Sequence, residues 1–135
     1  MPERDLARLL ATLDAERRDG DYVYLERPTF EPALAAAADA VVHEGEAVSY
    51  VLRRERLAAL DIAADAAQFP CAWLRLRVHS ALDAVGLTAA FAQALASRGI
   101  ARNVLAGLRH DHLLVPLDRA DDALAALRAL QSAHA

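Results

Sequence analysis

The fold is decided by residues 73–117, which read WLRLRVHSALDAVGLTAAFAQALASRGIARNVLAGLRHDHLLVPL. The stretch opens with alternating apolar and polar residues, continues with apolar residues at helical spacing, and closes with two short apolar runs. This order predicts a strand over 72–79, a helix over 81–98, and strands over 100–106 and 112–117. A further helix, with leucines at helical spacing, is expected after the last strand. The second half of the chain therefore has the order β-α-β-β-α.

The first predicted strand has a period of two, which is typical of a strand with one buried face. One set of its residues is expected to face the core, and the other set to face solvent or a partner. The core set is Ala72, Leu74, Leu76 and Val78, and the other set is Trp73, Arg75, Arg77 and His79.

Polar residues mark both ends of the predicted helix. Ser80 and Asp83 have the spacing of a capping pair, in which a hydroxyl and a carboxylate satisfy free N–H groups. Arg98 and Gly99 close the helix, where a cation and a left-handed residue are favoured. Gly86 is expected about one turn inside the helix, where glycine costs ~1 kcal/mol relative to alanine. Such a glycine indicates a close approach to the backbone, by a ligand or by a neighbouring subunit.

The first half of the chain contains the same order in a weaker form. Leucines at helical spacing predict an opening helix over residues 3–14, with Arg17 and Arg18 near its end. The elements expected after it are a strand over 21–27, a short helix over 32–39, a hairpin of 41–43 and 47–53 with Gly45 in the turn, and a helical segment over 54–60. Residues 68–70 mark a boundary. We therefore expect two tandem copies of one α+β unit, residues 1–67 and 68–135.

A split β-α-β arrangement, with the third strand between the first and the second, would bring separate polar residues to one edge of the sheet. The end of the first strand, the beginning of the helix and the hairpin at 107–112 share this edge. Free N–H groups at a helix start attract a carboxylate or phosphate, and nearby imidazoles could donate to that anion or bind a metal. The residues expected to converge are His79, Ser80, Gly86, His110 and His112.

Each of these polar residues also has a structural explanation. Asp83 is first a capping carboxylate and second a ligand contact. Asn103, the only asparagine, falls in a predicted strand, where a backbone bond or bulge explains it about as well as a ligand does. His110 and His112 flank Asp111 in a hairpin, where turn chemistry accounts for the group. Two histidines without a third placed ligand give weak support for zinc.

No segment carries a catalytic motif. No serine lies within Gly-x-Ser-x-Gly, and Cys71, the single cysteine, is expected to be an inert, partly buried thiol. A single cysteine excludes an internal disulfide and a multi-cysteine metal site. The absence of lysine removes Schiff-base chemistry and the lysine of a phosphate-binding loop. We therefore expect a protein that is not an enzyme and needs no cofactor.

Charge and hydropathy limit the partners of the chain. A formal net charge of −4 over 135 residues argues against nucleic acid, because nucleic-acid binders carry a basic face. No apolar run reaches the ~18 residues needed to span a bilayer, and the first residues lack the apolar core of a signal peptide. We expect a cytoplasmic protein that contacts neither nucleic acid nor membrane.

Blocks of residues, mostly in the second half, resemble the small bacterial ACT-domain proteins. The similarity is strong over roughly residues 72–130 and looser over the first half. The blocks taken together are specific, whereas Asp-x-x-Gly alone would not be. They are residues 78–80, 83–90, 103–107, 110–116 and 118–124.

The resemblance implies two ferredoxin-like β-α-β-β-α-β units of ACT type in tandem, with antiparallel sheets and helices on one face. ACT units bind amino acids or other small metabolites, often at interfaces between units, so it also implies an amino-acid-binding regulatory protein and a homodimer. Most ACT units regulate a fused enzyme domain, for which this chain has no room, so the target would be another chain. A module that only self-associates, without a ligand, is one alternative, and a protein that binds metal through His79, His110 and His112 is another.

The ligand site carried over by position lies at the connection between the first strand and the first helix. Asn103, on the second strand, would face this loop. Many ACT proteins have proline before the glycine, where this chain has valine. The loop residues are Asp83, Ala84, Val85, Gly86 and Leu87.

Overall fold

A computed structural model describes residues 5–77 and 86–135. The chain divides into two compact units. Unit 1 comprises the described residues up to Asp19 and those from Ala72 onward, and unit 2 is Gly20–Cys71. The predicted division into 1–67 and 68–135 follows the order of the two copies along the chain. The compact units differ from it because the N-terminal segment packs with the second half.

Unit 1 contains a four-stranded sheet with the order β1-β5-β7-β6. Strand β5 contributes to both units: its first residues belong to unit 2, and its residues from Ala72 onward belong to unit 1. The elements of unit 1 are α1 (Leu6–Ala11), β1 (Asp14–Arg17), β5 (Gln68–Arg77), α3 (Leu87–Ala96), β6 (Asn103–Ala106), β7 (Asp111–Pro116) and α4 (Ala120–Ser132).

The split β-α-β arrangement predicted for the second half is confirmed, because β7 lies between β5 and β6. β6 and β7 are antiparallel, with Asn103 opposite Leu114 and Leu105 opposite His112. The fourth strand of this sheet is β1, which pairs antiparallel with β5 from Asp14 opposite Arg77 to Arg17 opposite Leu74.

The opening helix predicted over residues 3–14 is wrong beyond Ala11. α1 ends there, and the next residues form β1. Leu13 and Ala15 are buried while Asp14 between them is exposed, which is the period of a strand. Leucine spacing alone missed this change of period, because the alternating stretch is short.

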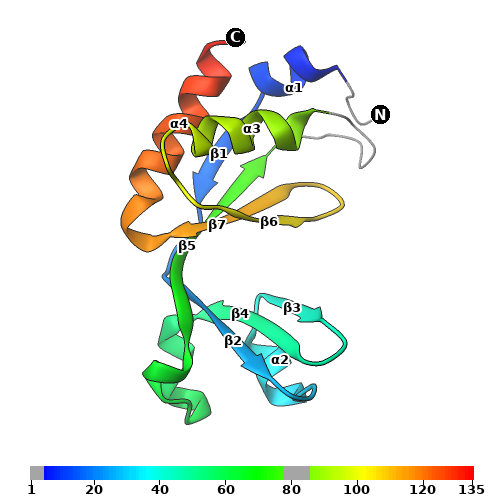
Figure 1. The fold of residues 1–135 in the computed structure, drawn as a ribbon, viewed down its shortest axis with the longest axis vertical. Coiled ribbons are helices and arrows are strands. Elements are labelled where there is room, and N and C mark those ends of the chain that lie inside the picture. Colours follow the sequence, from blue (N-terminus) through cyan, green and yellow to red (C-terminus); the bar gives the residue numbers. More distant parts are fainter. Residues whose placement is uncertain (1–4, 78–85) are drawn as a thin grey trace. The chain divides into compact units, whose positions relative to one another are not determined.

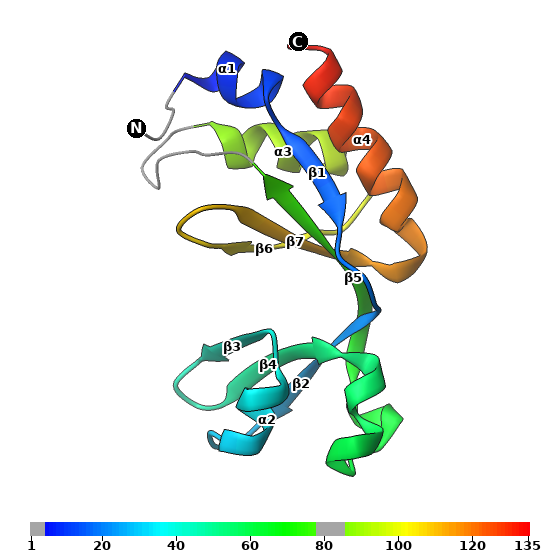
Figure 2. The same ribbon diagram turned by 180° about the vertical axis from the view of Figure 1, so that it is seen from behind.

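The core of unit 1 lies between one face of its sheet and the three helices, which Figures 1 and 2 both show on that face. The predicted core set of β5 is confirmed, since Ala72, Leu74 and Leu76 are fully buried in this cluster. Val78 lies outside the described residues. The large side chains that fill the cluster are Leu9, Leu10, Leu13, Leu74, Leu76, Leu87, Phe91, Leu95, Leu113, Leu124 and Leu127.

Unit 2 repeats the topology with the strand order β3-β4-β2-β5. Its elements are β2 (Tyr22–Arg27), α2 (Pro32–Ala37), β3 (Ala40–His43), β4 (Val48–Arg53), three 3₁₀ turns over Arg54–Arg56, Ala58–Leu60 and Ala64–Ala66, and the first residues of β5. The β3–β4 hairpin and its turn at Gly45, which has φ +97°, are as predicted. A separate core packs around Leu25, Leu34, Tyr50 and Leu52.

Two predictions for unit 2 need correction. The helical segment expected over 54–60 is a pair of 3₁₀ turns rather than a helix. The boundary expected at residues 68–70 is the beginning of β5, and Cys71 lies inside that strand. Phe69 has φ +49°, and the register of β2 with β5 shifts near it. This irregular start of the strand explains why residues 68–70 resemble a loop in sequence.

Both units are therefore ferredoxin-like, with antiparallel pairing between neighbouring strands and helices packed on the sheet. Within residues 5–77 and 86–135, none of the helices is long and apolar enough to cross a membrane.

Candidate functional site

The candidate site lies at one edge of unit 1. Figures 1 and 2 both place the end of β5, the beginning of α3 and the β6–β7 hairpin at the same end of this unit, as the sequence predicts. The part of the site that the structure describes comprises Gly86, Leu87, Asn103, His110 and His112. The predicted site residues that lie outside the described part of the chain are His79, Ser80, Asp83, Ala84 and Val85.

Gly86 does not lie one turn inside a helix, which corrects the prediction. It is the residue just before α3 and has φ +99°, a left-handed conformation that a helix cannot contain. A Cβ built on Gly86 would stand 3.0 Å from Cδ2 of Leu6 on α1. The close approach expected from this glycine therefore comes from the chain's own first helix.

The helix α3 begins abruptly at Leu87. Its side chain is buried in the core of unit 1, so only its backbone can take part in a site. The carbonyl of Gly86 accepts the first hydrogen bond of the helix, from the N–H of Ala90 at 2.9 Å. The N–H groups of the first turn have no partner within the helix and carry its partial positive charge.

Asn103 begins β6, and its side chain is exposed. It lies opposite Leu114, two residues along from the Leu105–His112 pair. Alternate residues of a strand share a face, and Leu113 and Val115 face the helices. Asn103 is therefore on the face of the sheet that turns away from the helices, the same face as His112.

The β6–β7 hairpin is tight around Gly107. The N–H of Gly107 donates to the carbonyl of His110 at 3.0 Å. A Cβ at position 107 would stand 2.9 Å from the backbone oxygen of His110, so only glycine fits here. Nδ1 of His110 is buried and has no hydrogen-bond partner in the described part of the chain.

His112 is held by Trp73. The indole Nε1–H donates to Nδ1 of His112 at 3.0 Å, and the two rings meet edge to face with centroids 5.5 Å apart. The guanidinium of Arg18 lies over the indole, 4.3 Å from the ring centroid. This hydrogen bond requires a neutral imidazole with its proton on Nε2, since Nδ1 is the acceptor.

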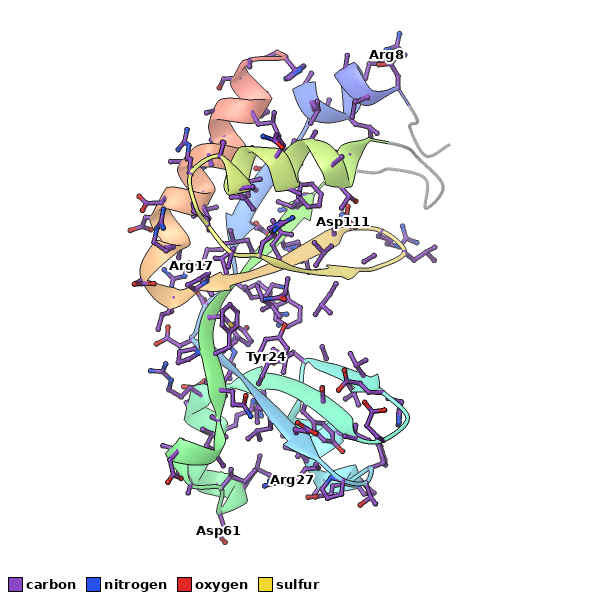
Figure 3. The ribbon with its side chains drawn as sticks, in the orientation of Figure 1. Arg8, Arg17, Tyr24, Arg27, Asp61 and Asp111 are labelled. Carbon is purple, nitrogen blue, oxygen red and sulfur yellow. The ribbon has the colours of Figure 1, made fainter. Side chains whose placement is uncertain are left out.

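The electrostatic environment favours that neutral form. Burial lowers the pKa of His112, and the nearby charges of Arg18, His110 and Arg75 lower it further. Burial raises the pKa of the neighbouring Asp111, labelled in Figure 3, against a smaller lowering by His110. The surroundings of the hairpin therefore disfavour a charged His112, so this imidazole is a poor cationic contact for an anion.

The described side chains do not assemble a metal centre. Among residues 5–77 and 86–135, no group of three or more His, Cys, Asp and Glu is close enough to hold a metal ion. The set of His79, His110 and His112 lies partly outside these residues. Cys71 is fully buried, and burial raises its pKa to about 12, so the thiol is held in its unreactive protonated form.

The corresponding connection in unit 2, between β2 and α2, is built differently. α2 begins with Pro32, which has no N–H to offer. The N–H of Glu31 donates to Oη of Tyr50 at 2.8 Å. The carboxylate of Glu31 lies at the helix start and pairs with Arg27 at 3.4 Å. The start of α2 is thus already occupied by the chain's own groups, whereas at the start of α3 the described residues provide no side-chain cap.

Two features of the site were missed from sequence. The first is the group of Trp73, Arg18 and His112, which the alternation in β5 could have suggested, because it places a tryptophan on the face opposite the core. The second is the contact of Leu6 with Gly86. It joins residues far apart in sequence, so no local pattern could have predicted it.

Comparison with known proteins identifies family models and solved structures that this chain resembles. A family model described as ACT domain matches residues 1–72, and a second ACT-domain model matches residues 68–129. A protein of unknown function from Vibrio cholerae, described as a possible transport protein, is 35% identical and has a TM-score of 0.81, with 93% of this chain and 95% of that chain covered.

More distant structures share the fold. A protein from Agrobacterium tumefaciens is 19% identical with a TM-score of 0.72, covering 88% of this chain and 89% of its own. The regulatory subunit of aspartate kinase from Thermus flavus is 16% identical with a TM-score of 0.61, covering 87% and 95%. No match was found among proteins with curated descriptions.

Proposed function

The chain belongs to the ACT-domain family, and we propose that it is a regulatory protein, active as a stand-alone chain, that binds an amino acid or a similar small metabolite in unit 1. The binding place is the connection between β5 and α3. The protein performs no catalytic step of its own, and its output is a change in another chain that it contacts.

The observation that carries this proposal is the difference between the two helix starts. α3 follows a left-handed glycine and offers the N–H groups of its first turn to an anion such as a carboxylate. α2 offers no comparable start, because Pro32 lacks an N–H, Tyr50 occupies the N–H of Glu31, and the Glu31 carboxylate would repel a ligand carboxylate. We therefore assign the amino-acid site to unit 1 alone.

Asn103 supplies the second contact in this proposal. Its amide oxygen can accept hydrogen bonds from a ligand ammonium group, and its exposure leaves it accessible. Because Asn103 stands on the face of the sheet turned away from the helices, this contact requires the ligand to reach around the edge strand β6 from the start of α3.

Two relatives support the regulatory, stand-alone part of the proposal. The Thermus flavus protein is named as the regulatory subunit of aspartate kinase, and this chain covers 95% of it. The Vibrio cholerae protein has almost the same extent, since the alignment covers 93% and 95% of the two chains.

The test is a thermal-shift screen of the twenty amino acids, followed by calorimetric titration of each compound that shifts the transition. A ligand present at about 100 times its dissociation constant stabilises the protein by ~2.7 kcal/mol. Asn103→Ala is expected to weaken the best ligand by about tenfold, the value of one hydrogen bond to a charged group. Arg102→Ala is the matched control, because Arg102 is also exposed and immediately precedes β6. Equal affinities in the wild type and in Asn103→Ala would remove Asn103 from the site, and no hit at all would reject the proposal.

A second candidate, a self-association module, is favoured by the edge of the sheet in unit 1. β6 ends the strand order, so one side of its backbone is unpaired within the described unit. Val104 on this strand is 37% exposed, and Leu108 at the hairpin tip is 76% exposed. A homodimer formed through this edge would appear in light scattering across a dilution series. Val104→Lys is expected to shift it toward monomer, and a monomer at every concentration would exclude it.

A further inference from the structure

Unit 2 departs from unit 1 in its second helical position. In unit 1 this position holds α4, which buries Ala120, Ala123, Leu124, Ala126 and Leu127. In unit 2 it holds three short 3₁₀ turns over residues 54–66, and Leu57 is the only buried residue among them. A helix that covers the sheet is replaced by a segment that covers less of it.

The chain itself stops a helix at this point. Asp61 has φ +56°, the left-handed conformation that ends helices. The N–H of Ile62 donates to the carbonyl of Leu57 at 3.0 Å, and the N–H of Asp61 donates to the carbonyl of Ala58 at 3.1 Å. This is the hydrogen-bond pattern of a Schellman motif, which brings the residue after the left-handed one against the first residue of the turn. Ile62 therefore packs with the cluster that contains Leu57, while Asp61 points away from the unit (Figure 3).

A groove of about 680 Å³ lies beside this turn, within unit 2. Such a volume falls within the range of small-molecule sites, which are mostly apolar with a few polar groups. A smaller depression of about 220 Å³ adjoins it and shares Arg54, Leu57 and Ala64. The residues that line the larger groove are Gly20, Asp21, Arg54, Glu55, Leu57, Ala58, Ile62 and Ala64.

Among the described residues, Arg54 is the one cation that lines the groove. Its backbone N–H is used, because it donates to the carbonyl of Asp21 at 2.8 Å and so joins the start of the turns to the start of β2. Its guanidinium has no hydrogen bond or ion pair among residues 5–77 and 86–135. The neighbouring Glu55 is occupied by Arg53, at 3.5 Å.

We propose that this groove in unit 2 binds an aliphatic monocarboxylate, with the carboxylate on the guanidinium of Arg54 and the carbon chain on Leu57 and Ile62. Arginine is suited to this contact because its planar fork binds a carboxylate through two parallel hydrogen bonds. Asp21 and Glu55 also line the groove, but Glu55 is paired with Arg53 and Asp21 has an interaction of its own. Arg54 is therefore the charged group available to a ligand, the apolar floor receives the carbon chain, and an alcohol has no charged partner there. The groove is separate from the amino-acid site proposed for unit 1, so either proposal can fail alone.

The two isoleucines of the chain make a direct test possible. Ile62 lines the groove, whereas Ile100 is buried in the core of unit 1. Protein labelled with ¹³C at the isoleucine δ1 methyl groups gives one signal from the groove and one internal control. Sodium hexanoate is the probe, with hexylamine and 1-hexanol as comparison compounds of the same chain length.

The expected result is a saturable shift of the Ile62 signal with hexanoate, an unmoved Ile100 signal, and a much weaker response to the amine and the alcohol. Arg54→Gln is expected to raise the dissociation constant about tenfold or more, because a charge-assisted contact is lost. Arg56→Gln is the matched control, since Arg56 is exposed in the same 3₁₀ turn but does not line the groove.

Three outcomes would overturn the proposal: an Ile62 signal that hexanoate does not move, an equal response to 1-hexanol, or equal weakening by Arg54→Gln and Arg56→Gln. Ala58→Trp gives a second check that does not depend on charge. Ala58 is exposed, so the indole would fill the groove from its rim, and hexanoate binding should disappear while both methyl signals keep their folded positions.

Discussion

Gly86→Ala tests the structure at the beginning of α3. Two physical effects oppose the methyl group. The residue has φ +99°, and an L-residue in a left-handed conformation costs about 1–2 kcal/mol. The new Cβ would also stand 3.0 Å from Cδ2 of Leu6, closer than carbon atoms approach without a shift.

The magnitude follows from these two effects and from one that opposes them. Alanine restricts the unfolded chain more than glycine does, which returns about 0.4–1 kcal/mol. The Leu6 contact is at the end of a flexible side chain that is 37% exposed, and moving that side chain off its rotamer costs about 0.5–1.5 kcal/mol. The sum predicts that Gly86→Ala lowers the free energy of unfolding by about 1–2 kcal/mol.

Urea unfolding followed by Trp73 fluorescence measures this change in unit 1, because Trp73 is the only tryptophan and belongs to that unit. Gly99→Ala is the matched control in the same unit. Gly99 has φ +69° but nothing within 4 Å of a Cβ, so it reports the backbone cost without the contact. The double variant Gly86→Ala with Leu6→Ala should recover about 0.5 kcal/mol relative to the sum of the single changes.

The reasoning would be refuted if Gly86→Ala and Gly99→Ala destabilised the protein equally and the double variant showed no coupling. In that case the backbone conformation alone would explain the glycine, and α1 would not approach the start of α3. If Gly86→Ala were neutral, the left-handed conformation of Gly86 itself would be wrong.

Further predictions concern three other positions. Asp61→Ala should lower the stability of unit 2 by about 1 kcal/mol, because alanine tolerates φ +56° less well than aspartate does. Asp61→Gly should not lower the stability of unit 2. Hydrogen exchange of the backbone amides in the turn checks both expectations. Tyr50→Phe should cost about 1 kcal/mol, because the N–H of Glu31 loses its partner, and Tyr24→Phe is the control for loss of a hydroxyl, with urea midpoints of unit 2 as the measurement. Folding lowers the pKa of His112 below its ordinary value of 6.5. Between the two pKa values the unfolded chain binds more protons at this residue than the folded chain does. The contribution of His112 to stability is therefore present above pH 6.5 and is lost as the pH falls below it. Wild-type unit 1 should therefore lose more stability between pH 7.5 and pH 5.5 than His112→Gln does, by Trp73-detected urea unfolding, and an equal loss would remove His112 as the cause.

The topology of unit 1 was predictable because its signals are local. Alternation along 72–77 marks a strand with one buried face, and the apolar residues of α3 and α4 recur at helical spacing. Gly45 and Gly107 stand in tight hairpin turns, where the chain reverses within a few residues. These patterns depend only on neighbours in sequence, so the order of strands and helices could be predicted from them.

The errors have a common physical origin. β1 pairs with β5, some sixty residues further along the chain, so its strand conformation is imposed by a distant partner rather than by its own leucine spacing. The helix predicted over 81–98 was expected to contain Gly86, whereas α3 begins after Gly86, which has a left-handed conformation; the predicted capping pair Ser80 and Asp83 lies outside the described residues. A glycine can be read as a position inside a helix or as the residue before one, and only φ distinguishes the two.

The two units show how one topology supports two different sites. Both have the same strand order, yet the groups that bind ligands lie at helix ends, which the strand order does not determine. In unit 1 the start of α3 follows the left-handed Gly86, and a continuous α4 packs on the sheet. In unit 2 Pro32, Glu31 and Tyr50 close the start of α2, and the left-handed Asp61 prevents a second helix from covering the sheet. The groove thus lies in the unit whose helix start is occupied by the chain's own groups, so the two copies are expected to bind chemically different ligands rather than two molecules of the same one.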